Sequence, residues 1–148
     1  MIAPADRWRS GAVMVEFAML ILPFITLVFG VIEYARMQWT RSALQEVALA
    51  GARCAGLQAV GCTLAATSGT TNRPYNAAAT RAFIRAQAAN WYIGLPPNGV
   101  AVTNNTTCNG AANFVRVSVT YTFSSPFLAP IRNASWPVTA VACFPNQT

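Results

Sequence analysis

The sequence predicts an α+β protein in which a long N-terminal helix precedes a small head. Residues 12–32 are apolar almost throughout and have the length of a membrane-spanning helix. Residues 114–124 instead alternate strictly between apolar and polar side chains, which is the pattern of a strand with one buried face. Such alternation suits an antiparallel sheet that is solvated on its other face. We therefore expect one head helix lying on roughly three antiparallel strands.

The apolar run has the dimensions of a membrane anchor. As a helix, residues 12–32 would span about 31 Å at ~1.5 Å per residue, close to the ~30 Å hydrocarbon core of a bilayer. Residues 1–10 are short, polar and mildly basic, as in a leader. A cleaved secretory signal is the competing interpretation. Its apolar core is usually shorter and is followed by a small-x-small site, whereas residues 33–36 after this run show no such site. Pro23 should kink the helix or free a carbonyl near residue 19.

We expect the helix to continue beyond the anchor through residues 33–53, which lack proline and are rich in helix formers. Glu33 and Arg36 are three residues apart and can form an ion pair. A stripe at helical spacing marks the face that packs on the head. This stripe comprises Tyr34, Met37, Leu44, Val47, Ala48 and Gly51.

The rest of the chain is expected to alternate short elements with loops. The expected elements are a loop at 55–76, a helix at 77–92, strands at 100–103, 114–124 and 137–144, and a polar loop at 104–113 that holds Cys108. On the helix, Arg81 and Arg85 are expected on the face opposite the packed one. The packed face is expected to comprise Ala79, Phe83, Ala86 and Asn90.

The charges are distributed unevenly and limit the chemistry. The net charge is +6, no histidine is present, and no acid follows Glu46. General acid–base catalysis draws on a short list of side chains, most of which the C-terminal part lacks. We therefore expect a protein that is not an enzyme and needs no metal or other cofactor. The scattered arginines are expected to solubilise a surface, and no run of basic and aromatic residues indicates nucleic-acid binding.

Four cysteines lie in the C-terminal part, at Cys54, Cys62, Cys108 and Cys143. None of them are spaced as the paired ligands of a metal site usually are. An even number in a head outside the membrane predicts two disulfides formed in an oxidising compartment. Three pairings are possible, of which we favour Cys54–Cys62 with Cys108–Cys143. Free buried thiols that pack as small hydrophobes are the alternative.

Gly11 and Glu16, five residues apart at the start of a long apolar helix, resemble the type III signal of type IV pilins and pseudopilins. The wider pattern is similar to the TadE-like pilus-assembly proteins of the Flp/Tad secretion system. It includes residues 9–18, Leu22-Pro23, residues 30–36, 43–45 and 50–53, and the late strand 115–123.

This resemblance implies a type IV pilin-like fold and cleavage between Gly11 and Ala12 by a prepilin peptidase. It implies a bacterial inner-membrane protein with one membrane pass and a periplasmic head. The protein would act as a minor pilin or pseudopilin, with other pilins and the inner-membrane assembly platform as partners. The expected division is a leader at 1–11, a transmembrane helix at 12–32, an amphipathic extension at 33–53 and a head at 54–148.

Glu16 needs an explanation, because an ionised carboxylate near hydrocarbon costs several kcal/mol. If cleavage makes Ala12 a free amine, Glu16 can neutralise it in its own subunit or in the next one of a filament. Alternatively, Glu16 lies at the lipid interface, where the helix dipole stabilises a first-turn acid.

A second functional hypothesis is a membrane-tethered adhesin or binding module whose basic head holds an anionic ligand. The orientation of the anchor does not follow from charge, because Arg7 and Arg9 precede the apolar run whereas Arg36 and Arg41 follow it. The cysteines favour an external head.

Overall fold

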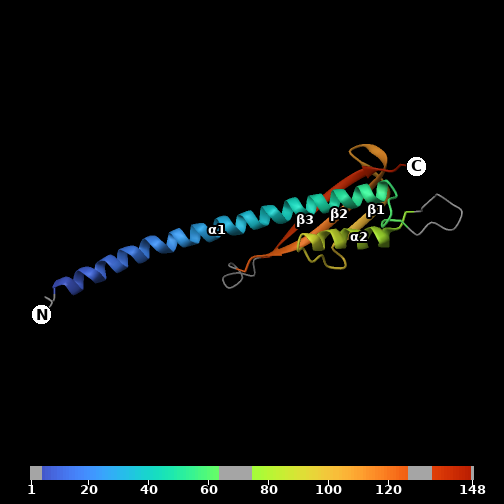
Figure 1. Cartoon of the computed structure of the whole chain (residues 1–148). Helices are drawn as coiled ribbons and strands as arrows, with labels where there is room; N and C mark the ends of the chain where they lie inside the picture. Colours follow the sequence, from blue (N-terminus) through green and yellow to red (C-terminus); the bar gives the residue numbers. More distant parts are fainter. Residues whose placement is uncertain (1–4, 64–74, 127–134, 148) are drawn as a thin grey trace. The chain divides into compact units, whose positions relative to one another are not determined.

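The structure, a computed structural model, describes residues 5–63, 75–126 and 135–147 of the 148-residue chain, and for residues 5–10 and 12 it describes the backbone alone. The elements in chain order are α1 (Ala5–Gly56), α2 (Ala77–Asn90), β1 (Val100–Cys108), β2 (Ala111–Ser124) and β3 (Ser135–Pro145) (Figure 1). A long apolar helix, a second helix and a three-stranded antiparallel sheet confirm the expected α+β, pilin-like fold class. Residues 64–74 of the expected 55–76 loop lie outside the described residues.

The chain divides into two compact units, residues 1–36 and residues 37–148. Helix α1 contributes to both, and it continues as one helix through Pro23, although a proline has no backbone N–H to donate within the helix. Just after the proline, the hydroxyl of Thr26 donates to the carbonyl of Leu22 at 2.8 Å, which satisfies a polar side chain on an apolar helix.

The sheet of the second unit has the strand order β1-β2-β3, with both pairs antiparallel. The predicted alternation of β2 is confirmed, because Val115, Val117, Val119 and Phe123 are buried. Strand β3 pairs with β2 without interruption from Pro145 opposite Phe114 to Ser135 opposite Ser124. The apolar face of this sheet forms one side of the core.

The polar loop expected at residues 104–113 is wrong. This stretch is the second half of β1, a two-residue turn at Asn109-Gly110 and the start of β2. Both turn residues have positive φ, 50° and 84°, as hairpins with two-residue loops require. Backbone pairing tolerates the polar side chains of β1 because they alternate between half-buried and exposed positions.

The packed face expected on α2 is wrong in part, although Phe83 packs against the core as expected. The buried side chains are Thr80, Ile84 and Ala88, whereas Ala86 and Asn90 are exposed. Thr80 can be buried because its hydroxyl lies 2.9 Å from the Asn76 carbonyl and 3.2 Å from the Cys62 carbonyl. A face chosen by apolarity alone misses such a residue. The helix begins after Asn76, whose side chain accepts hydrogen bonds from the first-turn backbone at 2.8 and 3.2 Å.

The second half of α1 packs its small-residue face on α2 and the sheet. The buried positions are Ala43, Leu44, Val47, Ala48, Gly51, Ala52, Cys54, Ala55 and Gly56. Gly51 is required for this approach, because a Cβ there would lie 2.6 Å from Cδ1 of Ile84. Met37 packs against the core as expected. The expectation for Tyr34 is wrong, since this side chain is exposed and lies in the other unit.

Candidate functional site

The first unit presents an exposed apolar surface along α1. Between Val13 and Ile32 the apolar side chains are exposed, apart from the half-buried Ile21. The helix is long and apolar enough to cross a membrane, and its most apolar window, of mean hydropathy 2.4, has no buried residue. Apolar surface of this extent is not stable in water, so it marks a membrane or protein contact. A single N-terminal helix of this kind fits a single-pass membrane protein.

Glu16 is exposed on this apolar surface, with Phe17 beside it at 63% exposure. One helical turn separates Glu16 from Ala12, so the two positions lie on the same face of α1. Gly11 also lies within α1, and the space around it is open. The three residues of the expected processing and charge-pairing site therefore lie on about one and a half turns of one helix.

The apolar run ends at an ion pair that the spacing predicts. Nη1 of Arg36 lies 3.1 Å from Oε1 of Glu33, and Glu33 is the more buried partner. An ion pair suits the position where a helix leaves a membrane, because the two charges neutralise each other next to the hydrocarbon. An exposed pair of this kind contributes little to stability itself.

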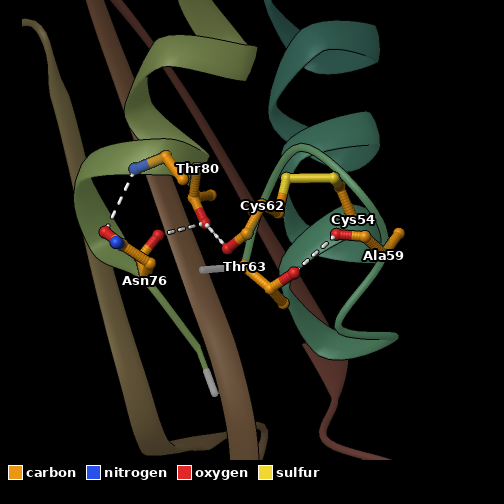
Figure 2. The surroundings of a disulfide bond; sticks show 7 residues. Cys54, Ala59, Cys62, Thr63, Asn76 and Thr80 are labelled. Carbon is orange, nitrogen blue, oxygen red and sulfur yellow. Dashed lines mark hydrogen bonds between the residues drawn. A yellow bond between two sulfur atoms is a disulfide. The ribbon is translucent and has the colours of Figure 1, made fainter. Parts of the chain in front are cut away.

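One disulfide closes the end of α1 (Figure 2). Cys54 and Cys62 are joined by an S–S bond of 2.05 Å, and the backbone of Ala59 donates to the Cys54 carbonyl at 2.9 Å. The Cys62 carbonyl in turn lies 3.3 Å from the backbone nitrogen of Asn76, which caps α2. This disulfide therefore fixes the end of α1 next to the start of α2.

The second disulfide joins Cys108 at the end of β1 to Cys143 on β3. These two strands flank β2 and do not pair with each other, so the bond connects the two edges of the sheet. All four cysteines are paired, in the combination that the sequence analysis favours. Disulfide-dense small heads are typical of oxidising compartments, because their cores are small.

A cluster of asparagines near the second disulfide was not anticipated as a structural feature. Nδ2 of Asn146 lies 2.9 Å from the side-chain oxygens of Asn104, Asn105 and Asn113. The cluster attaches the C-terminal segment to the irregular part of β1, where the register with β2 shifts. The run of amides in the sequence signals an irregular strand only weakly, because amides are common in ordinary turns.

The arginines expected to solubilise the head are divided between elements. Arg81 and Arg85 lie on α2, and Arg116 lies on β2 opposite Thr103 of β1. Arg85 is half-buried and donates from Nη2 to the Pro97 carbonyl at 2.6 Å. Within residues 5–63, 75–126 and 135–147, no group of three or more His, Cys, Asp or Glu side chains is placed to hold a metal ion.

A membrane-length N-terminal helix that continues into an α+β head with a three-stranded antiparallel sheet defines a pilin-like class of protein. The sequence model of one family, described as TadE-like protein, matches residues 11–53, from Gly11 to Arg53. The resemblance to TadE-like pilus-assembly proteins is thus confirmed over residues 11–53, whereas the late strand at 115–123 lies outside the match. No curated protein and no solved structure matches the chain.

The TadE-like match implies a role in Tad pilus assembly, with other pilins and the assembly machinery as partners. The matched segment contains all of the expected processing and pairing residues and ends one residue before Cys54, the first cysteine of the head. The head from residue 54 onward lies outside it. The match to the family is therefore confined to residues of α1.

Proposed function

We propose that this chain is a membrane-anchored minor pilin or pseudopilin that takes part in assembling a Tad/Flp pilus by packing α1 against other subunits. One observation carries the proposal: the TadE-like match runs from Gly11 to Arg53 and covers the whole exposed apolar surface that contains Glu16. Such a surface has to be covered by lipid before assembly and by neighbouring helices afterwards. The catalytic step of this system belongs to its partners, and this chain acts structurally.

In this proposal a prepilin peptidase removes residues 1–11 by cutting after Gly11. The peptide bond between Gly11 and Ala12 lies within α1, so the helix must unwind locally for this bond to enter a protease site. Glycine makes this easier, because it weakens a helix by about 1 kcal/mol relative to alanine. The mature chain then consists of the transmembrane helix at 12–32, the extension at 33–53 and the head at 54–148.

Cleavage creates a new amine at Ala12, and Glu16 is its proposed partner. Leaving either charge alone in hydrocarbon costs several kcal/mol, whereas a pair removes most of that cost. Within one subunit the pair would span a single helical turn. Between subunits the same pair would fix the axial register of neighbouring helices, which is the better-attested use of a buried charge pair.

The proposed location is the bacterial inner membrane with the head in the periplasm. Two disulfides in the head support this orientation, because the periplasm is oxidising whereas the cytosol keeps thiols reduced. The pilus platform in the same membrane would then meet α1, and the head would meet other subunits outside.

Intact-mass measurement of the membrane-extracted protein tests this proposal. Coexpression with the matching peptidase should remove the mass of residues 1–11, and reduction should add the mass of the hydrogens that two disulfides lack. Gly11→Val should block the cut, whereas Gly30→Val, at another open helical glycine, should not. An unshortened wild-type chain in the presence of active peptidase would contradict the processing step.

Pilus counts test the charge pair separately. Glu16→Gln removes the charge but keeps the shape, so piliation should fall while the anchor remains in the membrane. Glu46→Gln is the matched control, because Glu46 is an exposed acid on the second half of α1. Equal piliation in the two variants would rule out a role for the Glu16 charge.

A further inference from the structure

Helix α2 ends with a tyrosine at a backbone position that glycine usually occupies. The Ile93 backbone N–H donates to the Ala88 carbonyl at 3.0 Å, and the Tyr92 N–H donates to the Ala89 carbonyl at 2.9 Å. These two bonds define a Schellman motif, in which the residue after the cap adopts a left-handed conformation. That residue is Tyr92, with φ of 57°. Glycine usually occupies this position, because a Cβ is strained there.

The motif places two side chains in opposite environments. Ile93 is buried in the core, whereas Tyr92 is 98% exposed. The tyrosine ring therefore gains no packing within the described head that offsets its backbone strain. A bulky aromatic side chain held outward at a strained position indicates a contact outside this head, since strain at special positions tends to mark function.

Two tryptophans extend this exposed aromatic surface. Trp39 of α1 and Trp91, the residue that caps the end of α2, meet edge to face, with ring centroids 5.8 Å apart, and remain 65% and 40% exposed. Both belong to the second unit, as does Tyr92. We call Trp39, Trp91 and Tyr92 the aromatic corner. Trp39 of α1 meets Trp91 just after α2, whereas Gly51, later in α1, packs on Ile84, earlier in the chain, so the two helices run antiparallel. The aromatic corner therefore lies at the opposite end of α2 from the Cys54–Cys62 disulfide.

The chemistry of the aromatic corner fits a lipid headgroup layer. Tryptophan and tyrosine combine an apolar ring with a polar N–H or O–H and are enriched at both membrane–water interfaces. Trp39 follows the end of the apolar run at Ile32 by seven residues of the same helix. Arg41, two residues after Trp39 and exposed, suits anionic headgroups.

We propose that the aromatic corner docks the head onto the lipid headgroup layer of the membrane that α1 crosses. This inference rests on the membrane anchoring in the proposed function and goes beyond it, because it assigns a second membrane contact to the head. Docking through one ring on α1 and two rings just after α2 fixes the orientation of the head against the bilayer, which a single anchoring helix does not. Release of the aromatic corner then accompanies removal of the subunit into a filament.

Tryptophan fluorescence of the full chain tests the docking. The protein is reconstituted in vesicles of phosphatidylethanolamine and phosphatidylglycerol that contain a nitroxide-headgroup lipid. Trp8→Phe and Trp136→Phe leave only the two tryptophans of the aromatic corner. We expect strong quenching by the headgroup nitroxide and protection from aqueous acrylamide. Acrylamide quenching without nitroxide quenching would overturn the proposal. Protection from both quenchers would indicate a protein partner and would overturn it as well.

Flotation of the same vesicles separates this proposal from membrane anchoring. A chain that floats with the vesicles but shows no nitroxide quenching keeps its anchor and loses the docking contact. A chain that does not float has no anchor, and both inferences then fail.

A glycine substitution at Tyr92 separates docking from stability. Tyr92→Gly relieves the left-handed strain, so the melting temperature of the head in detergent should rise by about 4 °C. The same variant should lose part of the nitroxide quenching, which a purely structural role of Tyr92 would not predict. Asn109→Gly is the control, because it places a glycine at another left-handed position, with φ of 50°, in the β1–β2 turn away from the aromatic corner. If the nitroxide lipid quenches the tryptophan fluorescence of Tyr92→Gly and of Asn109→Gly to the same extent, Tyr92 does not contact the headgroup layer.

Discussion

Residues 13–36 and residues 37–56 lie on one helix, α1, but their side chains meet different surroundings. In the first stretch large apolar residues such as Phe17 and Leu20 are exposed. In the second, small residues such as Ala48 and Gly51 are buried against the head. The same backbone therefore carries two surfaces, one suited to lipid or helices of other subunits and one suited to close packing within the chain. Side-chain size and polarity separate the two functions, and secondary structure does not.

The largest expected effect concerns the disulfides, which belong to the head alone. Replacing Cys108 and Cys143 by alanine should cost about 4 kcal/mol of unfolding free energy, because their bond closes a long loop. The same change at Cys54 and Cys62, only eight residues apart, should cost about 2.5 kcal/mol. Denaturant unfolding in detergent measures both.

The helicity of the apolar half of α1 should survive either loss. Far-UV circular dichroism and vesicle flotation of the disulfide variants check this. Loss of flotation after removal of a disulfide would contradict the division of α1 into independent halves.

A charge placed in the apolar half of α1 sharpens the comparison further. Leu20→Arg should cost about 3 kcal/mol of membrane insertion, because a cation near the bilayer centre is poorly solvated. Gln45→Arg, at an exposed position of the second half, should change stability by no more than about 0.5 kcal/mol. Carbonate extraction of membranes reports the retained fraction. Equal retention of the two variants would show that residues near Leu20 do not lie in lipid.

Two glycines of α1 provide a matched pair. Gly51→Ala should destabilise the head by about 2 kcal/mol, because its Cβ would overlap Ile84. Gly30→Ala meets open space and should leave head unfolding unchanged while favouring the helix. Thermal unfolding of the two variants compares them directly. A neutral Gly51→Ala would mean that Ile84 has another rotamer available.

The smallest effect concerns pH and is confined to the head. Burial raises the pKa of the Tyr75 phenol above its usual value, and the nearby Arg81 charge partly opposes this rise. Because the folded pKa is the higher one, the stabilising contribution is complete below about pH 10 and is lost as the pH rises through the folded pKa. Urea unfolding at neutral and alkaline pH measures this slope.

Tyr75→Phe should flatten the alkaline slope with little loss of stability at neutral pH. The reason is that, among the described residues, the Tyr75 hydroxyl has no hydrogen-bond partner. An unchanged slope in the variant would assign the alkaline loss to another group.

Periodic patterns allowed part of the fold to be predicted. The alternation of β2 reflects one buried and one exposed face, and the apolar run of α1 reflects one apolar environment. The pattern of apolar and polar residues along the chain was therefore sufficient to predict both elements. The hairpin at Asn109-Gly110 was missed, although this dipeptide is a strong turn signal, because the polar residues around it resembled a loop. The α2 face was missed because Thr80 is buried through hydrogen bonds to distant carbonyls.

By itself the sequence determined the membrane-length apolar helix, the position of Glu16 relative to Gly11, and the main strand, because each depends on residues close together in the chain. Only the tertiary structure decided which glycine of α1 must remain a glycine, and which side chains gather at the end of α2. Trp39 and Trp91 are 52 residues apart and meet only because the core aligns their helices in antiparallel fashion. Contacts of this kind depend on packing between elements, which local patterns do not encode.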